Sequence, residues 1–176
     1  ASLNISGNIS NQGFFSDLGG TTVFEGESPQ LINSDTRLSF YNLTISSSAS
    51  VTNEADIDLI NTLKLQANSF FDADGESGNR KFVLISSSNN TARLDAVEAG
   101  AQLSGNVTWQ RLVDSKPVPG WYFLTTPIKN QKVNHWQDNL RIQGMDNSFP
   151  NAGKVLFSYD EKMSTDTQQG SDGWQP

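Results

Sequence analysis

The chain has 176 residues, a net charge of −7 at pH 7 and no cysteine. The lack of cysteine excludes disulfides, thiolate catalysis and zinc sites with cysteine ligands, and the acidic balance disfavours nucleic acid, which is bound through a basic surface. The sequence has no apolar run long enough to span a membrane, and we expect its acidity to keep the chain soluble and monomeric.

Apolar residues recur at intervals of twenty along most of the chain. They are Leu3, Val23, Leu43, Leu63, Val83, Leu103 and Phe123. Several of them begin short alternating segments, such as 3–7, 43–47 and 83–87, and this alternation is typical of strands with one buried face. A constant period is typical of a coil whose turns stack on one another. The pattern predicts that the seven side chains form one column.

Residues 1 to about 115 read as consecutive strands without a convincing helix. In the segment 57–65, four apolar residues fall on one face, and Asn61 has the same parity. A buried asparagine needs hydrogen bonds, so we expect its partner to be an asparagine or a backbone group of the next turn. Turn-forming residues separate the strands at 19–20, 74–75, 86–90 and 99–100.

The character of the sequence changes at the Pro/Gly-rich stretch 114–120, which marks a boundary. We therefore predict an all-β fold, with a coil of stacked strands over 1–118, about 20 residues per turn and five or six turns. A smaller, β-rich segment that caps the coil and contains tryptophan follows over 119–176. An ordinary β-sandwich is the alternative if the twenty-residue period is accidental.

The end of the sequence is polar from about residue 164 and then reads Gly173-Trp174-Gln175-Pro176. A tryptophan so close to the end of a polar tail favours a native protein that continues further. We therefore expect the chain to be a fragment.

Few residues suggest catalysis or metal binding. The single histidine, His135, lies in a polar stretch without a Gly-x-Ser-x-Gly motif, which favours an ordinary loop histidine over a catalytic one. Asp72, Asp74 and Glu76 offer hard oxygen ligands for calcium. Their spacing departs from an EF-hand loop, however, and this favours an Asp-Gly turn with solvated acids over a calcium site. We predict no catalytic residue, no metal and no cofactor.

Aromatic residues in the second segment suggest a weaker possibility. Tyr122, Trp136 and Trp174 are candidates for ligand binding, because flat rings stack on sugar faces. The run Gly-Trp-Tyr-Phe-Leu at 120–124 is apolar, so Trp121 and Phe123 are expected to fill the end of the coil.

The segments 3–8, 40–45, 91–94 and 105–111 resemble repeat regions of very large surface proteins from gliding and polymer-degrading Bacteroidetes bacteria. The segment 120–127 is similar to the one that closes those coils, and residues around Trp136, Gly144, 159–161 and 173–174 are similar to the domain that follows. The resemblance covers most of the chain, with diffuse motifs. It implies a right-handed single-stranded β-helix, exported across the outer membrane through the type nine secretion route.

We therefore expect a non-catalytic stalk, spacer or adhesive module of a secreted bacterial cell-surface protein. Its partners would be glycans or surface polymers and the neighbouring domains of the same large protein. The alternative is a carbohydrate-binding module of a polysaccharide-degrading enzyme. A polysaccharide lyase or hydrolase built on a β-helix is the third hypothesis, by analogy of fold alone.

Overall fold

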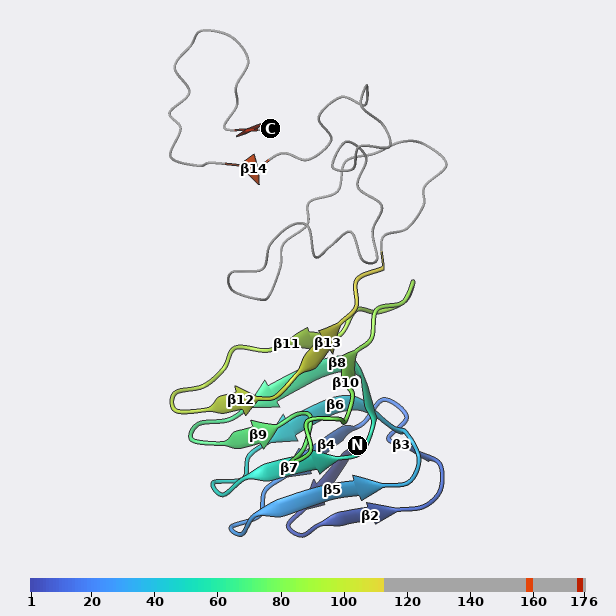
Figure 1. The fold of residues 1–176 in the computed structure, drawn as a ribbon, viewed down its shortest axis with the longest axis vertical. Coiled ribbons are helices and arrows are strands. Elements are labelled where there is room, and N and C mark those ends of the chain that lie inside the picture. The colour runs from blue at the N-terminus through green and yellow to red at the C-terminus, as the bar shows by residue number, and fades with distance from the viewer. Residues whose placement is uncertain (113–157, 160–173, 176) are drawn as a thin grey trace, which may run out of the picture. The chain divides into compact units, whose positions relative to one another are not determined.

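The structure is a computed structural model that describes residues 1–112 and the pairs 158–159 and 174–175. All regular secondary structure in these residues is β (Figure 1). The strands are β1 (Ser2–Ile5), β2 (Ile9–Asn11), β3 (Phe15–Ser16), β4 (Thr21–Phe24), β5 (Gln30–Ser34), β6 (Leu38–Ile45), β7 (Val51–Glu54), β8 (Ile57–Leu65), β9 (Phe70–Asp72), β10 (Phe82–Leu84), β11 (Arg93–Leu94), β12 (Gln102–Ser104), β13 (Val107–Trp109), β14 (Ser158–Tyr159) and β15 (Trp174–Gln175).

The strands of residues 1–112 stack in parallel as a β-solenoid of about 5 turns, roughly 21 residues apart. This confirms the coil predicted from the sequence. The β-sandwich alternative is wrong, because every pairing between named strands of this range is parallel and joins strands of successive turns.

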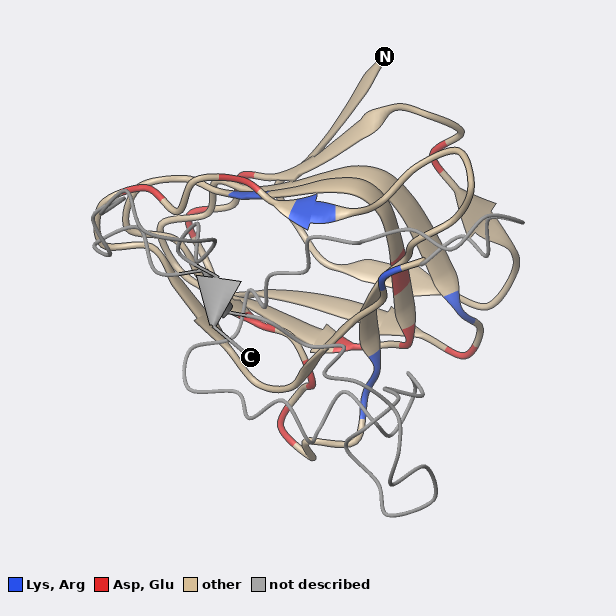
Figure 2. Ribbon diagram, turned by 90° about the horizontal axis from the view of Figure 1, so that it is seen from above, with Lys and Arg blue, Asp and Glu red and all other residues tan. Residues whose placement is uncertain are grey.

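Each turn of the coil passes through three sides. The first side contains β3, β10, β13 and the first halves of β6 and β8. The second side contains β1, β4, β11 and the second halves of β6 and β8. The third side is a separate sheet in the order β12-β9-β7-β5-β2. The β6–β8 register shifts between Phe40 and Asn42, where the two strands pass from the first side to the second. Figure 2, seen from above, shows long strands bending round a corner.

The prediction that apolar residues at every twentieth position form one column is wrong, because the structure aligns other residues. The residues aligned on the second side are Leu3, Thr22, Leu43, Leu63 and Leu94. Their successive spacings are 19, 21, 20 and 31 residues. Val83 instead aligns with Asp58 on the first side, and Leu103 aligns with Phe71 on the third. The expected column is thus spread over three sides, and Phe123 lies outside the described residues.

The period varies because the connections between the sides differ in length. Residues 73–81 link β9 to β10, and residues 85–92 link β10 to β11, so the turn that contains them is longer than the others. Backbone pairing fixes the height of each strand in the stack. A longer connection costs little additional free energy, since the entropic cost of loop closure rises only slowly with loop length.

The inward side chains of successive turns form one continuous core. In β8, buried side chains alternate with partly exposed ones, and the fully buried residues are Ile57, Leu59, Leu63 and Leu65. Aromatic rings fill the interior next to them, as where Phe71 meets Phe82 edge to face with ring centroids 5.3 Å apart. The alternation arises because successive residues of a strand point to opposite faces.

Three asparagines form a hydrogen-bonded row at the corner between the first and second sides. The Asn61 side chain donates to Asn42 Oδ1 at 2.8 Å, and Asn90 donates to Asn61 Oδ1 at 3.5 Å and to the Ile60 carbonyl at 2.9 Å. Asn42 in turn donates to the Gly20 carbonyl at 3.2 Å. The prediction that Asn61 bonds to an asparagine or a backbone group of a neighbouring turn is confirmed, and its partners are asparagines. We call Asn42, Asn61 and Asn90 the asparagine row.

Buried polar side chains also hold the turn between the second and third sides. Gln30 donates to the carbonyls of Ile5 and Gly7, at 3.0 and 2.7 Å, and accepts from the Gly26 amide at 2.8 Å. Ser47 donates to the Gly26 carbonyl at 2.7 Å. In the described part of the chain, every buried side-chain nitrogen and oxygen has a hydrogen-bond partner.

The second segment is described only at β14 and β15. They form an antiparallel pair in which Ser158 lies opposite Gln175, and Tyr159 lies opposite Trp174. The predicted boundary between residues 118 and 119 lies outside the described residues and stays a prediction.

Candidate functional site

The residues predicted to bind a ligand lie almost wholly outside the described part of the chain. Tyr122 and Trp136 belong to the range that is not described, as does His135. Trp174 is placed only by its backbone, in β15 opposite Tyr159. Glycan binding through these rings therefore stays a prediction.

The three carboxylates predicted as possible calcium ligands have separate surroundings. Asp74 is buried and accepts two hydrogen bonds from Asn106, at 2.9 Å from its backbone amide and 2.7 Å from its side chain. Asp72 accepts from Ser104 Oγ at 3.5 Å, whereas Glu76 is exposed. Among residues 1–112, no three acidic or histidine side chains come close enough to hold a metal ion.

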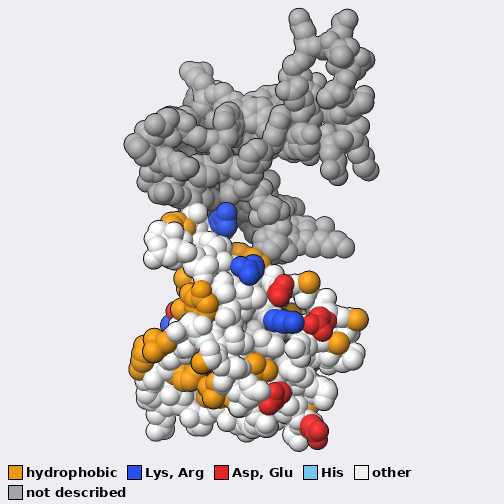
Figure 3. Space-filling model, turned by 180° about the vertical axis from the view of Figure 1, so that it is seen from behind, with side chains coloured by type: hydrophobic (Ala, Val, Ile, Leu, Met, Phe, Trp, Pro, Cys, Tyr) orange, Lys and Arg blue, Asp and Glu red, His pale blue; other side chains and the backbone are white. Residues whose placement is uncertain are grey.

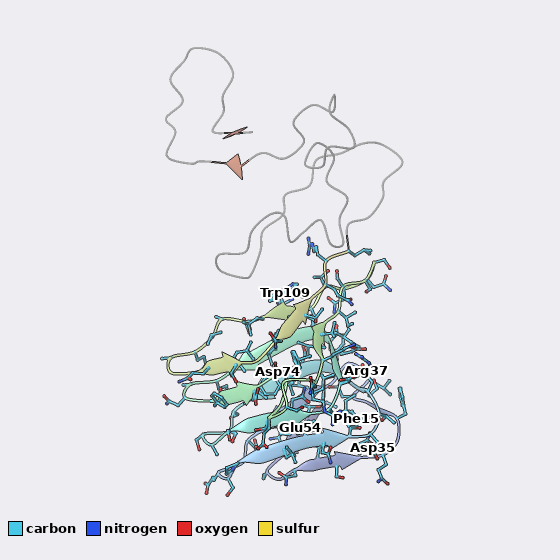
Figure 4. The ribbon with its side chains drawn as sticks, in the orientation of Figure 1. Phe15, Asp35, Arg37, Glu54, Asp74 and Trp109 are labelled. Atoms are coloured by element: carbon cyan, nitrogen blue, oxygen red, sulfur yellow. The ribbon has the colours of Figure 1, made fainter. Side chains whose placement is uncertain are left out.

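Three of the four ion pairs among the described residues lie where the third side passes into the first (Figure 4). We call this region the acidic corner and define it as Glu54, Asp56, Asp58 and Asp74 with the bases Arg37 and Arg80. Glu54 ends β7 and Asp58 lies in β8, while Asp56 and Asp74 occupy the connections after β7 and β9.

Ion pairs link successive turns across the acidic corner. Arg37 contacts Asp58 at 2.6 Å and Asp56 at 3.4 Å, and its side chain is 42% exposed. Arg80 contacts Glu54 at 3.6 Å. Pairs with this degree of exposure each contribute about 0–1 kcal/mol, because water screens them. These pairs therefore connect side chains of neighbouring turns but add little to stability.

The same acids also cap backbone amides of the long connection after β9. Glu54 accepts from the Glu76 amide at 2.8 Å, and Asp56 accepts from the Lys81 amide at 3.1 Å. Side chains of the preceding turn therefore hold this connection in place. These contacts attach the long connection 73–81 to the regular strands of the coil, which is a structural role.

Glycine permits the close approach that Asp74 needs. Gly105 has a φ of +84°, and a Cβ at this position would overlap the Asp74 carboxylate. Only glycine adopts such a backbone without strain. The Asp74 carboxylate therefore reaches the Asn106 amide directly, and the turn between β12 and β13 closes over it.

Asp17, a partly buried acid outside this corner, was not identified from the sequence. Its carboxylate accepts from the Tyr41 amide at 2.7 Å and from Thr22 Oγ1 at 3.3 Å. Burial raises the pKa of Asp17 above its ordinary value, and these hydrogen bonds partly offset the rise. The sequence feature that could have indicated Asp17 is the turn Asp17-Leu18-Gly19-Gly20. A hydrogen bond from the Gly20 amide to the Asp17 carbonyl closes this turn.

The distribution of side chains over the coil surface is uneven. On the face seen in Figure 3, hydrophobic side chains gather toward one side of the coil and charged ones toward the other. The described part of the chain contains no helix long and apolar enough to cross a bilayer.

Stacked parallel strands, a continuous core and polar rows at the corners place the described chain in the class of β-solenoids. Comparison with protein-family models, curated proteins and solved structures finds no match for this sequence. The resemblance to Bacteroidetes surface proteins therefore remains an expectation from the sequence.

Proposed function

We propose that the chain is a non-catalytic structural or adhesive module, a stalk or spacer, of a secreted bacterial cell-surface protein. The observation that carries the proposal is the continuous parallel stacking of turns on three sides, with seven aligned residue pairs between β6 and β8 alone. Each further turn adds about 4.8 Å to the length of such a coil. A spacer needs this property, because its length is then set by the number of turns.

The acidic corner also favours a structural role over hydrolysis. A glycosidase needs one carboxyl group to protonate the leaving group and another to act as base or nucleophile. Here Asp56 and Asp58 are paired with Arg37, and Asp74 is buried under Asn106. These contacts hold the carboxylates between successive turns of the coil, in a structural role.

Single-molecule stretching between the two ends of the 176-residue chain tests the mechanical part of the proposal. We expect the coil to hold its length and then unravel in large cooperative steps. Together these steps should release roughly 350 to 400 Å for the described coil, at about 3.4 Å per residue. The Leu63→Ala variant, which loses a fully buried side chain, should unravel at lower force. Gradual extension at low force would contradict a spacer.

Incubation with uronate and neutral glycans tests the non-catalytic part. We expect no increase in reducing ends and no absorbance from unsaturated uronate. Depolymerisation by the purified chain that is lost in Asp58→Asn would contradict the proposal and point to the acidic corner as a catalytic site.

A further inference from the structure

Some asparagines of the chain occur in the tripeptide pattern Asn-x-Ser/Thr, which accepts N-linked glycans on surface loops of secreted proteins. They are Asn4, Asn8, Asn42, Asn89 and Asn106. A chain rich in asparagine, serine and threonine contains such tripeptides by chance, so the pattern alone assigns no site. The contacts of each side chain in the coil distinguish one member of the set from the others.

Two of the asparagines that are followed by Asn-x-Thr spacing use their side-chain amides inside the coil. Asn42 belongs to the asparagine row and donates to the Gly20 carbonyl at 3.2 Å. Asn106 donates to the buried Asp74 carboxylate at 2.7 Å. A glycan is attached through this same amide nitrogen. It would therefore disturb the asparagine row at Asn42 and crowd the Asp74 carboxylate at Asn106.

The two asparagines with serine at the third position also have partners for their side chains. Asn4 donates to the Glu25 carboxylate at 3.0 Å, and the Asn8 side-chain oxygen accepts from the Leu31 amide at 2.8 Å. Both side chains thus take part in contacts between the first turn and the second.

Asn89 differs from the other four in its surroundings. It lies in the exposed stretch 87–89, and its side chain donates no hydrogen bond to any other residue of the described part of the chain. Its backbone amide donates to Ser87 Oγ at 3.3 Å, which leaves the side chain free. A group attached to the Asn89 amide nitrogen would therefore displace none of these contacts.

Asn89 is at the tip of a small hairpin between β10 and β11. Ser86 and Thr91 form an antiparallel bridge at its base, and the Ser87 amide donates to the Asn90 carbonyl at 2.7 Å. At the same corner of the coil, β6 and β8 continue from the first side to the second without a break. The hairpin is therefore an addition to the regular turn, and a bulky group at its tip leaves the stacked strands undisturbed.

The base of the hairpin is attached to the coil more firmly than the tip. Asn90 donates to the Ile60 carbonyl at 2.9 Å, and Ser86 Oγ lies 2.8 Å from Thr91 Oγ1. A glycan transferase must bind all three residues of the tripeptide, and in the folded coil two of them are held by these contacts. Transfer to Asn89 therefore takes place before this turn has folded, and the folded turn then keeps the glycan in solvent.

We propose that Asn89 is an acceptor site for an N-linked glycan. The donor class is an oligosaccharide linked to a polyisoprenyl diphosphate. The Asn89 side-chain nitrogen bonds to C1 of the first sugar and gives up one proton, while the bond from C1 to the diphosphate oxygen breaks. The lipid diphosphate leaves with that electron pair. The inference rests on the export that the proposed function includes, because this modification occurs on secreted chains.

Secretion of the 176-residue chain through a pathway whose oligosaccharyltransferase needs only Asn-x-Ser/Thr tests the proposal. Intact mass of the secreted, folded chain measures the glycan. Release by peptide N-glycosidase in heavy-oxygen water converts each occupied asparagine to labelled aspartate, which peptide mapping locates. We expect Asn89 to be occupied and Asn42 and Asn106 to be unoccupied. An unoccupied Asn89, or equal occupancy at Asn42 or Asn106, would overturn the proposal.

Substitutions separate the tripeptide from the hairpin that presents it. Asn89→Gln and Thr91→Val should each lose the glycan at this site, whereas Thr91→Ser should keep it, because serine retains both the tripeptide and a hydroxyl for Ser86. The matched control Asn79→Gln changes an exposed asparagine that is outside any such tripeptide, and it should carry the same glycan as wild type. Circular dichroism checks that each variant is folded.

The variants also give results that contradict the site. Secretion that requires Asn89→Gln, or a glycan mass that is unchanged in this variant, would overturn the proposal. The stretching and depolymerisation experiments need no glycan, so the failure of this modification and the failure of the spacer role are distinguishable.

Discussion

At the scale of single residues, the asparagine row shows how a polar side chain is tolerated at a partly buried corner. A buried donor or acceptor without a partner costs about 1–3 kcal/mol. Asn61 avoids this cost because its amide bonds to Asn42 and its carbonyl accepts from Asn90. The parity of Asn61 within an apolar strand was sufficient to predict this arrangement, because only a hydrogen-bonded asparagine fits there.

Removing the middle member of the row should weaken the coil. We expect Asn61→Ala to lower the free energy of unfolding by about 1–2 kcal/mol, since Asn42 Oδ1 loses its donor and only partial access to water compensates. Urea unfolding measures this as a lower midpoint with an unchanged m value. The control Asn33→Ala removes an exposed asparagine of β5 and should stay within about 0.5 kcal/mol of wild type. Equal losses in both variants would contradict a role for the row.

The second residue-scale feature is the partly buried carboxyl of Asp17, whose pKa is raised by burial. A raised pKa means that the folded state binds the proton more tightly than the unfolded state does. The contribution of Asp17 to stability is therefore fully present below the unfolded pKa, about 3.9. It decreases as the pH rises through the pKa of the folded state.

Replacing Asp17 by asparagine should remove this pH dependence and keep an acceptor for the Tyr41 amide. We expect the free energy of unfolding of Asp17→Asn, minus that of wild type, to increase with pH upward from about 3.9. Urea unfolding at several pH values measures it. Asp17→Ala should show the same pH dependence at lower stability, because the amide loses its acceptor. A difference that is flat or falls with pH contradicts the assignment.

At the scale of elements, position along the coil decides how much a side chain contributes. β6 and β8 lie between neighbours on both sides, and their inward residues are fully buried. Among the described strands, β1, β2 and β3 pair on one edge only, and Leu3 is half-exposed although it belongs to the same column as Leu63. Strands of similar sequence therefore differ in stability because of their place in the stack.

The same substitution at two heights of one column should reveal this difference. We expect Leu63→Ala to cost about 2–5 kcal/mol, because it leaves a cavity in a packed core. Leu3→Ala should cost about 1 kcal/mol, since much of the side chain is already in water. Chemical unfolding of both variants, at a concentration where each is monomeric, gives the comparison. Equal costs would show that the first turn is as well packed as the middle.

At the scale of the whole molecule, the coil is held by internal contacts of its own residues. In residues 1–112, Asp74 is satisfied by Asn106, and no group of three acids or histidines is placed to bind a metal ion. The connection after β9 is instead fastened by Glu54 and Asp56. Arg37 pairs with Asp56 and Asp58, and Arg80 pairs with Glu54. Three of the four acids of this corner therefore have a basic partner within the chain, and the fourth, Asp74, accepts from Asn106.

Removal of divalent cations should therefore leave the coil unchanged. We expect the same Tm by differential scanning calorimetry with millimolar EDTA, with millimolar calcium and without either. The variant Glu76→Gln, which removes an exposed predicted ligand, should respond in the same way. A calcium-dependent rise in Tm that is lost in Glu76→Gln would show that the metal hypothesis from the sequence was correct.

The sequence predicted the architecture of the coil better than it predicted the candidate site, the acidic corner. Alternating apolar residues indicated strands, because alternation is a local property of a few neighbouring residues. Their recurrence at intervals of about twenty indicated a coil, although the residues of the expected column proved not to lie above one another. The acidic corner was missed, since Arg37 meets Asp58 across 21 residues of sequence. Such a pairing depends on the register between turns. The predicted ligand-binding rings, Tyr122, Trp136 and Trp174, remain untested for a different reason, because the described structure does not include their side chains.

The sequence by itself determined that the described chain is all-β and built of stacked turns, and that Asn61 is hydrogen-bonded. It predicted about 20 residues per turn, where the structure has roughly 21. Those properties follow from side-chain parity and from the need to satisfy buried polar groups. Only the tertiary structure decided which residues lie above one another, because insertions at 73–81 and 85–92 change the spacing without changing any local pattern.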